Sequence, residues 1–296
     1  MDICTFLPFY PKIMTIYVEV FHTFYLSLYK ILYKPTYKTM KRTILTTIVA
    51  LLIAGNAMAW DNRSHSTIAR IAEKHLTPRA KANIERYIDG HSVVYYASWM
   101  DYNRTFPPYD VTHDWHVDYW TDAQRTDAEG NPLPPQSVDN IKRIMREMSD
   151  FRSMPDSVVN INIKYLVHLV GDMHCPVHVN FAKYRPLKIK WGKEQIKYHK
   201  FYDGYIIALK HKNASPLALA DELDRVDDAR RAELQAGTPD DWHEETLHYS
   251  TKSYELLPED KVITDKYLSE VAPLAEHLLV AAGYRLALIF NTIFDK

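Results

Sequence analysis

The sequence predicts a mainly α-helical protein, built as a single domain with one small β-hairpin. Apolar residues recur at helical spacing in most segments after residue 63. Glycine is scarce, with 8 residues in 296, which argues against doubly wound or glycine-rich β architectures. A composition of 47% hydrophobic and 25% charged residues suits a globular chain of one or two domains.

The helical segments follow one another along the chain. Residues 64–75 carry isoleucines and alanines at helical spacing and end before Thr77-Pro78, which stops one helix and starts the next. Residues 217–236 alternate charged residues with leucines and alanines, as in a solvated amphipathic helix. The predicted helices are 64–75, 78–87, 137–151, 160–175, 201–209, 217–236, 241–254 and 268–294.

One segment has the pattern of strands. In residues 187–198, alternating apolar and polar residues flank Gly192-Lys193-Glu194, which is a hairpin signal. Residues 97–135 are rich in proline and tryptophan and are predicted to form loops at one side of a functional site.

The first 59 residues are predicted to lie outside the fold. Met40-Lys41-Arg42 is basic, residues 43–55 are apolar, and Ala57-Met58-Ala59 matches an A-x-A cleavage site. We therefore expect a signal peptide over residues 40–59, a secreted or periplasmic location, and a wrongly assigned start codon behind residues 1–39. The apolar run is shorter than the roughly 20 residues that span a bilayer, and an uncleaved membrane anchor is the alternative.

Residues 60–296 would then be net acidic. Of the 36 Lys and Arg residues six fall in residues 1–59, and of the 37 Asp and Glu residues two do, so the remainder carries 30 basic and 35 acidic groups, a formal charge of −5. Such a chain has no broad basic surface for polyphosphate backbones, and attraction to a phosphate ester must come from bound metal ions. The one cysteine left, Cys175, is interpreted as a small packed residue.

The strongest functional signal lies in residues 165–178, which hold three histidines and one aspartate within eleven residues: His168, Asp172, His174 and His178. His168 and Asp172 are four apart, so they share a helix face at a separation of about 6 Å. An imidazole and a carboxylate aimed at one point bind a divalent metal, typically zinc. Pro176 ends the helix, which lets His178 turn toward a second point. The alternative is a buried helix whose histidines are merely hydrogen-bonded.

Other segments repeat the same ligand types. His199 and Asp203 have the same four-residue spacing, although an isolated pair of this kind is more often a helix-surface contact. Three further segments hold Asp or His next to tryptophan: 60–65, 99–101 and 114–116. Together they offer more ligands than one zinc ion uses, so a site with several zinc ions is the economical interpretation.

In this order, the segments resemble the zinc-dependent single-strand nucleases of fungi and plants, the S-one/P-one type, which share a fold with bacterial zinc phospholipase C. The resemblance covers essentially all of residues 60–296. It rests on Trp60 with His65 five residues later, A-x-W-x-D at 97–101, Trp115-His116, L-x-H-x-x-G-D-x-H-x-P-x-H at 166–178, H-x-x-x-D at 199–203 and A-G-x-R-L-A at 282–287. The central motif is highly specific.

The resemblance implies three zinc ions per chain, with Asp172 as a bridge between two of them. The first ion would take Asp101, His116, His168 and Asp172. The second would take His178, His199 and Asp203. The third would take Trp60, His65 and Asp172. Trp60 would bind through its α-amino group and carbonyl oxygen, and only cleavage after Ala59 would free that amine. His174 is not among these ligands and is expected to have a structural role.

The implied activity is hydrolysis of single-stranded DNA or RNA and of 3′-nucleotides, which gives 5′-phosphates or nucleosides. Zinc lowers the pKa of the attacking water. Asp101 would also orient this nucleophile, and Arg104 would stabilise the developing phosphate charge, whereas the simpler interpretation of Arg104 is a solvated loop residue. The expected partner is a single-stranded nucleic acid or nucleotide, with no stable protein partner and no membrane span in residues 60–296.

Three departures from the family pattern concern the substrate. Residues 181–186 replace the usual Gly-Gly-Asn turn. Val117 stands where the family has a base-stacking aromatic, for which Tyr119 and Trp120 are the nearby substitutes. The usual aspartate three residues after His116 is Tyr119, with Asp118 one place early.

These departures leave other functions open. A zinc phospholipase C-like phosphoesterase would show an exposed aromatic loop near the site, for which residues 102–120 qualify. A non-catalytic zinc-dependent binding protein would lack some ligands, and none is missing. A membrane-anchored protein of another kind would require residues 1–39 to be part of the protein.

Overall fold

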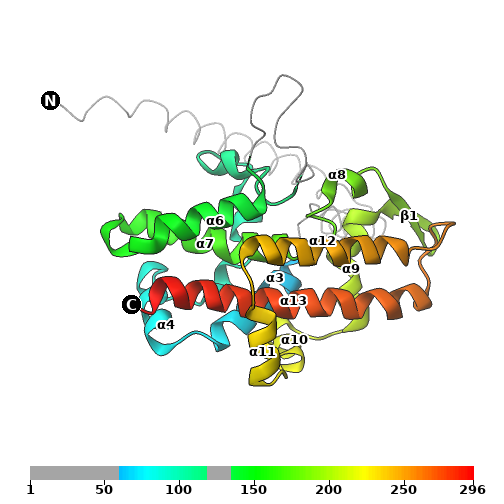
Figure 1. Ribbon diagram of the computed structural model, residues 1–296. Helices are drawn as coiled ribbons and strands as arrows, with labels where there is room; N and C mark the ends of the chain where they lie inside the picture. The colour runs from blue at the N-terminus through cyan, green and yellow to red at the C-terminus, as the bar shows by residue number, and fades with distance from the viewer. Residues whose placement is uncertain (1–59, 119–134) are drawn as a thin grey trace, which may run out of the picture. The chain divides into compact units, whose positions relative to one another are not determined.

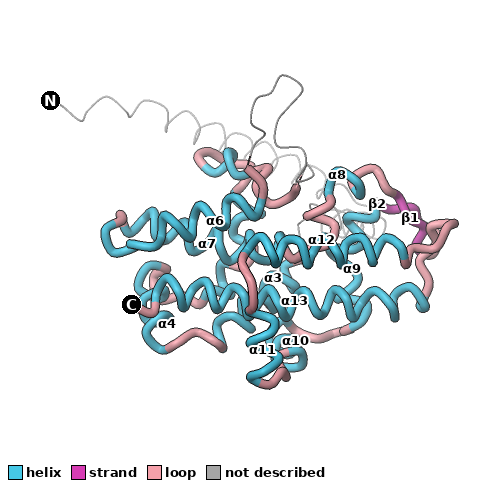
Figure 2. The backbone as a smooth tube through the Cα atoms, in the orientation of Figure 1, coloured by secondary structure: helices cyan, strands magenta, loops and turns pink. Residues whose placement is uncertain are grey.

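The computed structural model describes residues 60–118 and 135–296, and the expectations for residues 1–59, Tyr119 and Trp120 fall outside these ranges. The described part consists of helices and one two-stranded antiparallel sheet, as predicted (Figures 1 and 2). The α-helices are α3 (Asn62–Lys74), α4 (Pro78–Tyr87), α5 (Trp99–Asn103), α6 (Ser137–Glu147), α7 (Asp156–Met173), α8 (Phe181–Tyr184), α9 (Tyr198–Lys210), α10 (Pro216–Leu223), α11 (Asp228–Gln235), α12 (Pro239–Glu255) and α13 (Asp265–Phe294). Short 3₁₀ helices are η1 (Val93–Tyr96), η2 (Tyr109–Thr112) and η3 (Met148–Ser153).

Side chains before the first turn determine where several helices begin. Asp61 accepts a hydrogen bond from the amide of Ser64 at 2.9 Å and caps α3. Thr77 caps α4, where Pro78 occupies the first turn at no cost in hydrogen bonds. Thr238 caps α12 in a capping box with Asp241. These polar residues therefore place helix starts close to where the sequence pattern predicts them.

Helix α13 is the central element of the core and packs against α3, α4, α7, α9, α11 and α12 (Figure 1). Gly283 lets α3 approach closely, because a Cβ atom there would lie 2.6 Å from Ile71 Cβ. Within the described residues, α13 is the one helix long and apolar enough to cross a membrane, but 78% of its apolar stretch is buried inside the protein. That degree of burial is typical of a core helix.

Helix α7 is apolar around most of its circumference and is buried from Tyr165 to Met173. It packs against α3, α4, α5, α6 and α13, so its polar residues must find partners inside the protein. It ends at Met173, three residues before Pro176, as the proline predicts. The two polar ligand candidates of α7 therefore lie in the interior.

The hairpin prediction is confirmed. Strand β1 (Lys188–Trp191) pairs with β2 (Glu194–Lys197), and Gly192-Lys193 form the turn between them. Gly192 adopts a φ of 60°, which glycine tolerates at no steric cost. Glu194, expected in the turn, pairs with Trp191 as part of β2.

The single helix predicted for residues 217–236 is wrong, because the structure has two helices with a break at residues 224–227. Asp224 turns inward and accepts ion pairs from Lys74 at 2.7 Å and from His75 at 2.8 Å. Asp227 then caps α11 through the amide of Arg230. The prediction of loops over residues 97–135 also missed α5 and η2. Helices α7 and α9 begin three to four residues earlier than predicted.

Candidate metal centre

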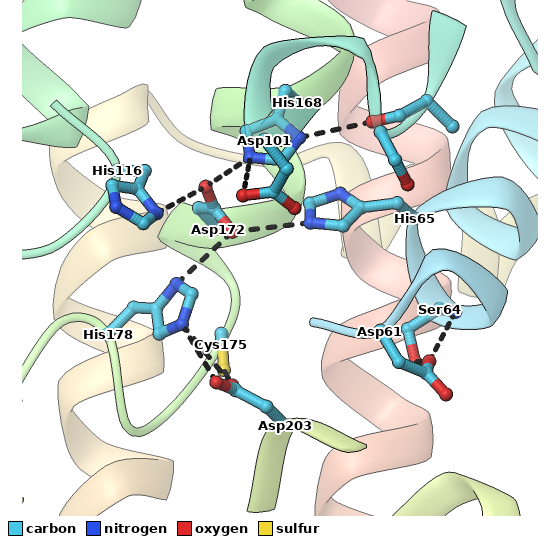
Figure 3. Close-up of polar contacts among 12 residues, drawn as sticks. Asp61, Ser64, His65, Asp101, His116, His168, Asp172, Cys175, His178 and Asp203 are labelled. Carbon is cyan, nitrogen blue, oxygen red and sulfur yellow. Dashed lines mark hydrogen bonds and ion pairs between the residues drawn. The ribbon is translucent and has the colours of Figure 1, made fainter. Parts of the chain in front are cut away.

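Six parts of the fold direct His and Asp side chains at one interior region, most of which is drawn in Figure 3. Helix α7 contributes from the middle of the domain, α3 and α5 from one side and α9 from another, and two loops complete the set. The side chains that meet there are His65, Asp101, His116, His168, Asp172, His178, His199 and Asp203.

Asp172 is the point at which these side chains converge. Its Oδ1 atom lies 3.3 Å from His65 Nε2 and 3.2 Å from His178 Nδ1. Its Oδ2 atom lies 3.0 Å from His168 Nε2 and 3.5 Å from His116 Nδ1. One carboxylate therefore faces four imidazoles, two on each oxygen, which is the arrangement expected of a bridging ligand.

Asp101 completes the first predicted ligand group. Its Oδ1 lies 3.6 Å from His168 Nε2, on the side of that ring which faces Asp172. His168 is held in this orientation by its other ring nitrogen, since Nδ1 donates a hydrogen bond to the Ala97 carbonyl at 3.1 Å. A backbone partner for one nitrogen leaves the other free to bind a metal.

A second group lies beyond Pro176. His178 Nε2 lies 3.3 Å from Asp203 Oδ1, and His199 Nε2 lies 3.2 Å from Asp203 Oδ2. The two imidazole rings stack with their centroids 5.1 Å apart. The turn after α7 thus carries His178 between Asp172 and Asp203, so that its two nitrogens face different carboxylates.

The donor atoms of this region are buried without hydrogen-bond partners. Among the described residues, twelve buried side-chain nitrogen and oxygen atoms have none, and nine of these belong to His65, Asp101, His168, Asp172, His178 and His199. Each such atom costs free energy unless something else satisfies it. The paired donors lie 3.0–3.6 Å apart, while bond lengths of about 2.0–2.3 Å give edges of roughly 3.3–3.7 Å in a tetrahedral zinc site. The residues therefore fit zinc.

The electrostatics also suit a cation. Burial lowers the pKa of His168, but the charges of Asp172 and Asp101 outweigh it and raise that pKa to about 9. Burial likewise lowers the pKa of His178, and Asp203 with Asp172 raises it to about 10. The three carboxylates create a negative potential that favours protons on the buried imidazoles, and a metal ion competes with those protons.

Arg104 lies among the ligands rather than in solvent. Its side chain is 14% exposed, its Nε lies 3.4 Å from Asp101 Oδ1, and its guanidinium contacts the ring of His116. Burial lowers the pKa of His116 to about 4, and Arg104 adds to this effect by its charge. The solvated-loop interpretation of Arg104 is therefore wrong.

Trp60 is buried, and the start of α3 lies close to the second group. The Asp61 amide donates a hydrogen bond to the Asp203 carbonyl at 3.3 Å. The structure thus brings the backbone at residues 60–61 to the edge of the donor cluster.

No sequence signal pointed to His243, nor to its pairing with Asp118 near the site. His243, from α12, lies 2.5 Å from Asp118 Oδ2 through its Nε2 atom, and the Asp118 amide donates to the His178 carbonyl at 2.9 Å. This pair supports the turn that carries His178, and no sequence spacing links residues 125 positions apart.

The buried side chain of Val117 has no aromatic ring to offer a base. The thiol of Cys175, which the sequence assigned to packing, points toward Asp203 (Figure 3).

Gly171 is the residue that lets α3 and α7 share the site, and Gly171→Ala is expected to disrupt it. A Cβ atom at residue 171 would lie 2.7 Å from His65 Nδ1 and 2.9 Å from His65 Cε1. Because the ring must move away from Asp172, we expect metal affinity to fall by about 10- to 100-fold, comparable to losing a supporting contact of a ligand. Isothermal titration with zinc measures this. The exposed turn residue Gly90 in a Gly90→Asn variant is the control, and unchanged affinity in Gly171→Ala would contradict the placement of His65.

A helical domain with a buried cluster of His and Asp donors is the class of protein that the fold and the site define. A family model described as S1/P1 Nuclease matches residues 60–295. The chain therefore belongs to the S1/P1 nuclease family, and it is a hydrolase of phosphodiester bonds.

Curated relatives agree with this assignment. Endonuclease 4 of Arabidopsis thaliana is 24% identical over 279 residues, covering 82% of this chain and 92% of that protein. Endonuclease 3 of the same plant is 21% identical over 269 residues, with the same coverage of 82% and 92%. Endonuclease 1 of the same plant is 26% identical over 148 residues, and the match covers 44% of this chain and 48% of the length of Endonuclease 1. The recognition of this family from sequence motifs is confirmed.

Proposed function

We propose that this protein is a secreted or periplasmic trinuclear-zinc nuclease that cleaves single-stranded DNA or RNA and 3′-nucleotides. The observation that carries the proposal is the buried set of unpartnered His and Asp donors around Asp172. Membership in a nuclease family supplies the reaction class. The expected products are 5′-phosphates from polynucleotides and nucleosides from 3′-nucleotides.

The donor groups divide into three positions. Asp101, His116, His168 and Asp172 would hold one ion. His178, His199 and Asp203 would hold a second. His65 and Asp172, with the backbone of Trp60, would hold a third. When bound, zinc supplies Lewis acidity toward a phosphate ester and lowers the pKa of water.

The protein's own residues orient the reaction. Asp172 presents one carboxylate oxygen to His65 and His178 and the other to His116 and His168. Asp101 has an oxygen beside both His168 and Arg104. The guanidinium of Arg104 is fixed by Asp101 and His116, so it is preorganised to accept the charge that develops on a phosphate. Residues 60–296 carry more acidic than basic groups, so the protein as a whole does not attract a phosphate, and the attraction must come from the site itself.

The signal peptide is part of the proposal, because only cleavage after Ala59 creates a free amine on Trp60. An amine and the carbonyl of the same residue form a five-membered chelate. The buried position of Trp60 and the hydrogen bond from Asp61 to Asp203 support a ligand at this end of α3.

An extra methionine before Trp60 tests this role. We expect loss of one zinc ion per chain and a fall in activity of about 10- to 100-fold, because the amine moves out of reach while the other donors stay. Metal analysis and initial rates on purified protein measure both. An alanine added after Lys296 is the control, and full zinc content in the methionine variant would refute the amine ligand.

The proposed function as a whole is tested by metal content and a substrate panel. Metal-replete protein should contain about three zinc ions, lose activity with a chelator and recover it with zinc. The panel is single-stranded DNA, double-stranded DNA, RNA, 3′-AMP and phosphatidylcholine. A preparation that holds no zinc under replete conditions would overturn the proposal.

One observation favours a second candidate, a zinc phospholipase C-like phosphoesterase. Tyr102, Phe106 and Val111 are 57%, 59% and 70% exposed and lie on the segment between the ligands Asp101 and His116. Such side chains suit a lipid surface as well as unstacked bases. Turnover of phosphatidylcholine without turnover of nucleic acid would support this alternative.

A further inference from the structure

We propose that Cys175 is a fourth protein donor to the metal ion held by His178, His199 and Asp203. The inference rests on the proposed function, since it concerns the second zinc position. Neither the family resemblance nor the spacing of residues in the sequence makes Cys175 a metal ligand.

The position of the thiol carries the inference. Cys175 Sγ lies 3.1 Å from Asp203 Oδ1, and the same oxygen lies 3.3 Å from His178 Nε2. The ligand atoms of Cys175, His178 and Asp203 all lie within 4.8 Å of one another, and all three residues are buried. A sulfur at a Zn–S bond length of about 2.3 Å belongs at such distances from a nitrogen and an oxygen ligand. Figure 3 shows the sulfur on the side of Asp203 that faces His178.

A second observation points to a ligand at the same place. His199 Nε2 is buried, lies 3.2 Å from Asp203 Oδ2, and has no hydrogen-bond partner. His178 and His199 both direct Nε2 at the two oxygens of one carboxylate, with the thiol at its edge. The Asp203 carboxylate therefore has the thiol and His178 at one oxygen and His199 at the other.

The backbone holds the thiol in this orientation. The Cys175 amide donates to the Asp172 carbonyl at 2.9 Å, and the Cys175 carbonyl accepts from the His178 amide at 2.9 Å. The turn between two ligands is thus closed by hydrogen bonds around Cys175 itself. A packed apolar residue would not require the sulfur to face a carboxylate.

Coordination replaces one bond by another without a redox change. The S–H bond breaks, its proton leaves to solvent, and the sulfur lone pair forms the bond to the metal, so one proton is released per ion bound. Four protein donors make a closed position of the kind found at structural zinc sites, whereas catalytic positions keep one site open. A thiolate also favours zinc over magnesium, calcium or manganese at this position.

Cobalt(II) substitution tests the inference with a spectroscopic signal. A Co–S bond gives charge-transfer absorption in the near ultraviolet, while cobalt with nitrogen and oxygen ligands alone shows only its weak visible bands. We expect the near-ultraviolet band in the native protein and its loss in Cys175→Ser, because Cys175 is the one cysteine of residues 60–296. Loss of a residue that only supports a ligand lowers metal affinity by about 10- to 100-fold. In Cys175→Ala, the affinity of one site for zinc should fall by more than this.

The outcomes separate this inference from the proposed function. Native protein that binds its full cobalt content without the near-ultraviolet band overturns the role of Cys175 and leaves the zinc nuclease intact. Protein that binds neither cobalt nor zinc overturns both. Because the native spectrum alone decides between these outcomes, the test does not depend on whether the variants fold.

Discussion

Asp172→Asn is expected to reduce hydrolysis by a factor on the order of 10³ or more, because metal ions supply several kcal/mol of charge stabilisation in such reactions. Asparagine keeps the volume of the side chain but removes the negative charge that four imidazoles face. A neutral amide bridges metal ions poorly, so two of the three zinc positions lose a ligand at once. The expected zinc content falls together with the rate.

Zinc content and initial rates on 3′-AMP and single-stranded DNA measure this effect. Asp156→Asn is the matched control, because Asp156 is an exposed aspartate on the same helix α7 and should leave both quantities within about twofold. Circular dichroism checks that the variant folds. Normal zinc content in a folded, inactive Asp172→Asn protein would contradict the bridging role.

Arg285→Met is expected to lower the free energy of unfolding by about 3 kcal/mol, and the melting temperature by about 6 to 12 °C, since it removes the buried charged partner of Glu245 and leaves that carboxylate with His277 as its remaining ion-pair partner. Arg285 is buried and donates from Nε to the Leu234 carbonyl at 2.8 Å and from Nη1 to His174 Nε2 at 2.9 Å. Its Nη2 atom pairs with Glu245. We take the low end of the usual range because the Glu245 side chain is 29% exposed.

The double variant Arg285→Met with Glu245→Gln separates the ion pair from the other contacts of Arg285. If the Glu245 carboxylate, which then has only His277 as an ion-pair partner, causes most of the loss, neutralising it should restore about 1 kcal/mol or more. Chemical denaturation of the two single variants and the double variant gives the coupling energy. An additive double variant would show that packing and the bonds to Leu234 and His174 cause the loss.

The acid dependence of this pair has a defined sign. Burial by itself would raise the pKa of Glu245. His277 and Arg285 outweigh burial and lower that pKa from its ordinary value of 4.5 to about 2. Because the folded pKa is depressed, the pair stabilises the protein fully above pH 4.5 and loses this contribution as the pH falls toward 2. The difference in unfolding free energy between native protein and Arg285→Met should shrink over that interval.

The same contacts show what His174, for which the sequence predicts a structural role, contributes. His174 lies inside the ligand motif, but its Nδ1 donates to the Val170 carbonyl at 2.7 Å and its Nε2 faces Arg285. Burial lowers its pKa to about 3, so it stays neutral and accepts from the guanidinium. It closes the end of α7 and connects the ligand helix to α13.

Local spacing made much of this site predictable. His168 and Asp172 share a face of α7 because they are four residues apart, and Pro176 ends that helix so that His178 can turn away. His199 and Asp203 repeat the spacing on α9. In each case the geometry depends on a few neighbouring residues, and the periodicity of a helix converts sequence distance into spatial distance.

Other features depend on contacts between segments that are far apart in the chain. The break at residues 224–227 follows from ion pairs of Asp224 with Lys74 and His75, about 150 residues away. No pattern within residues 217–236 encodes them. The pairing of Asp118 with His243 is equally non-local.

By itself, the sequence determined the helical fold class, the hairpin, the family and the candidates for metal donors, because helix periodicity, turn residues and motif order are local properties. Only the tertiary structure decided which donors meet, since α3, α5, α7 and α9 must pack before His65, Asp101, Asp172 and Asp203 approach one another. It also decided that Arg104 lies among the ligands and that the Cys175 thiol faces Asp203. Side-chain direction at a turn depends on the neighbours that the fold supplies, and the sequence of the turn alone does not specify them.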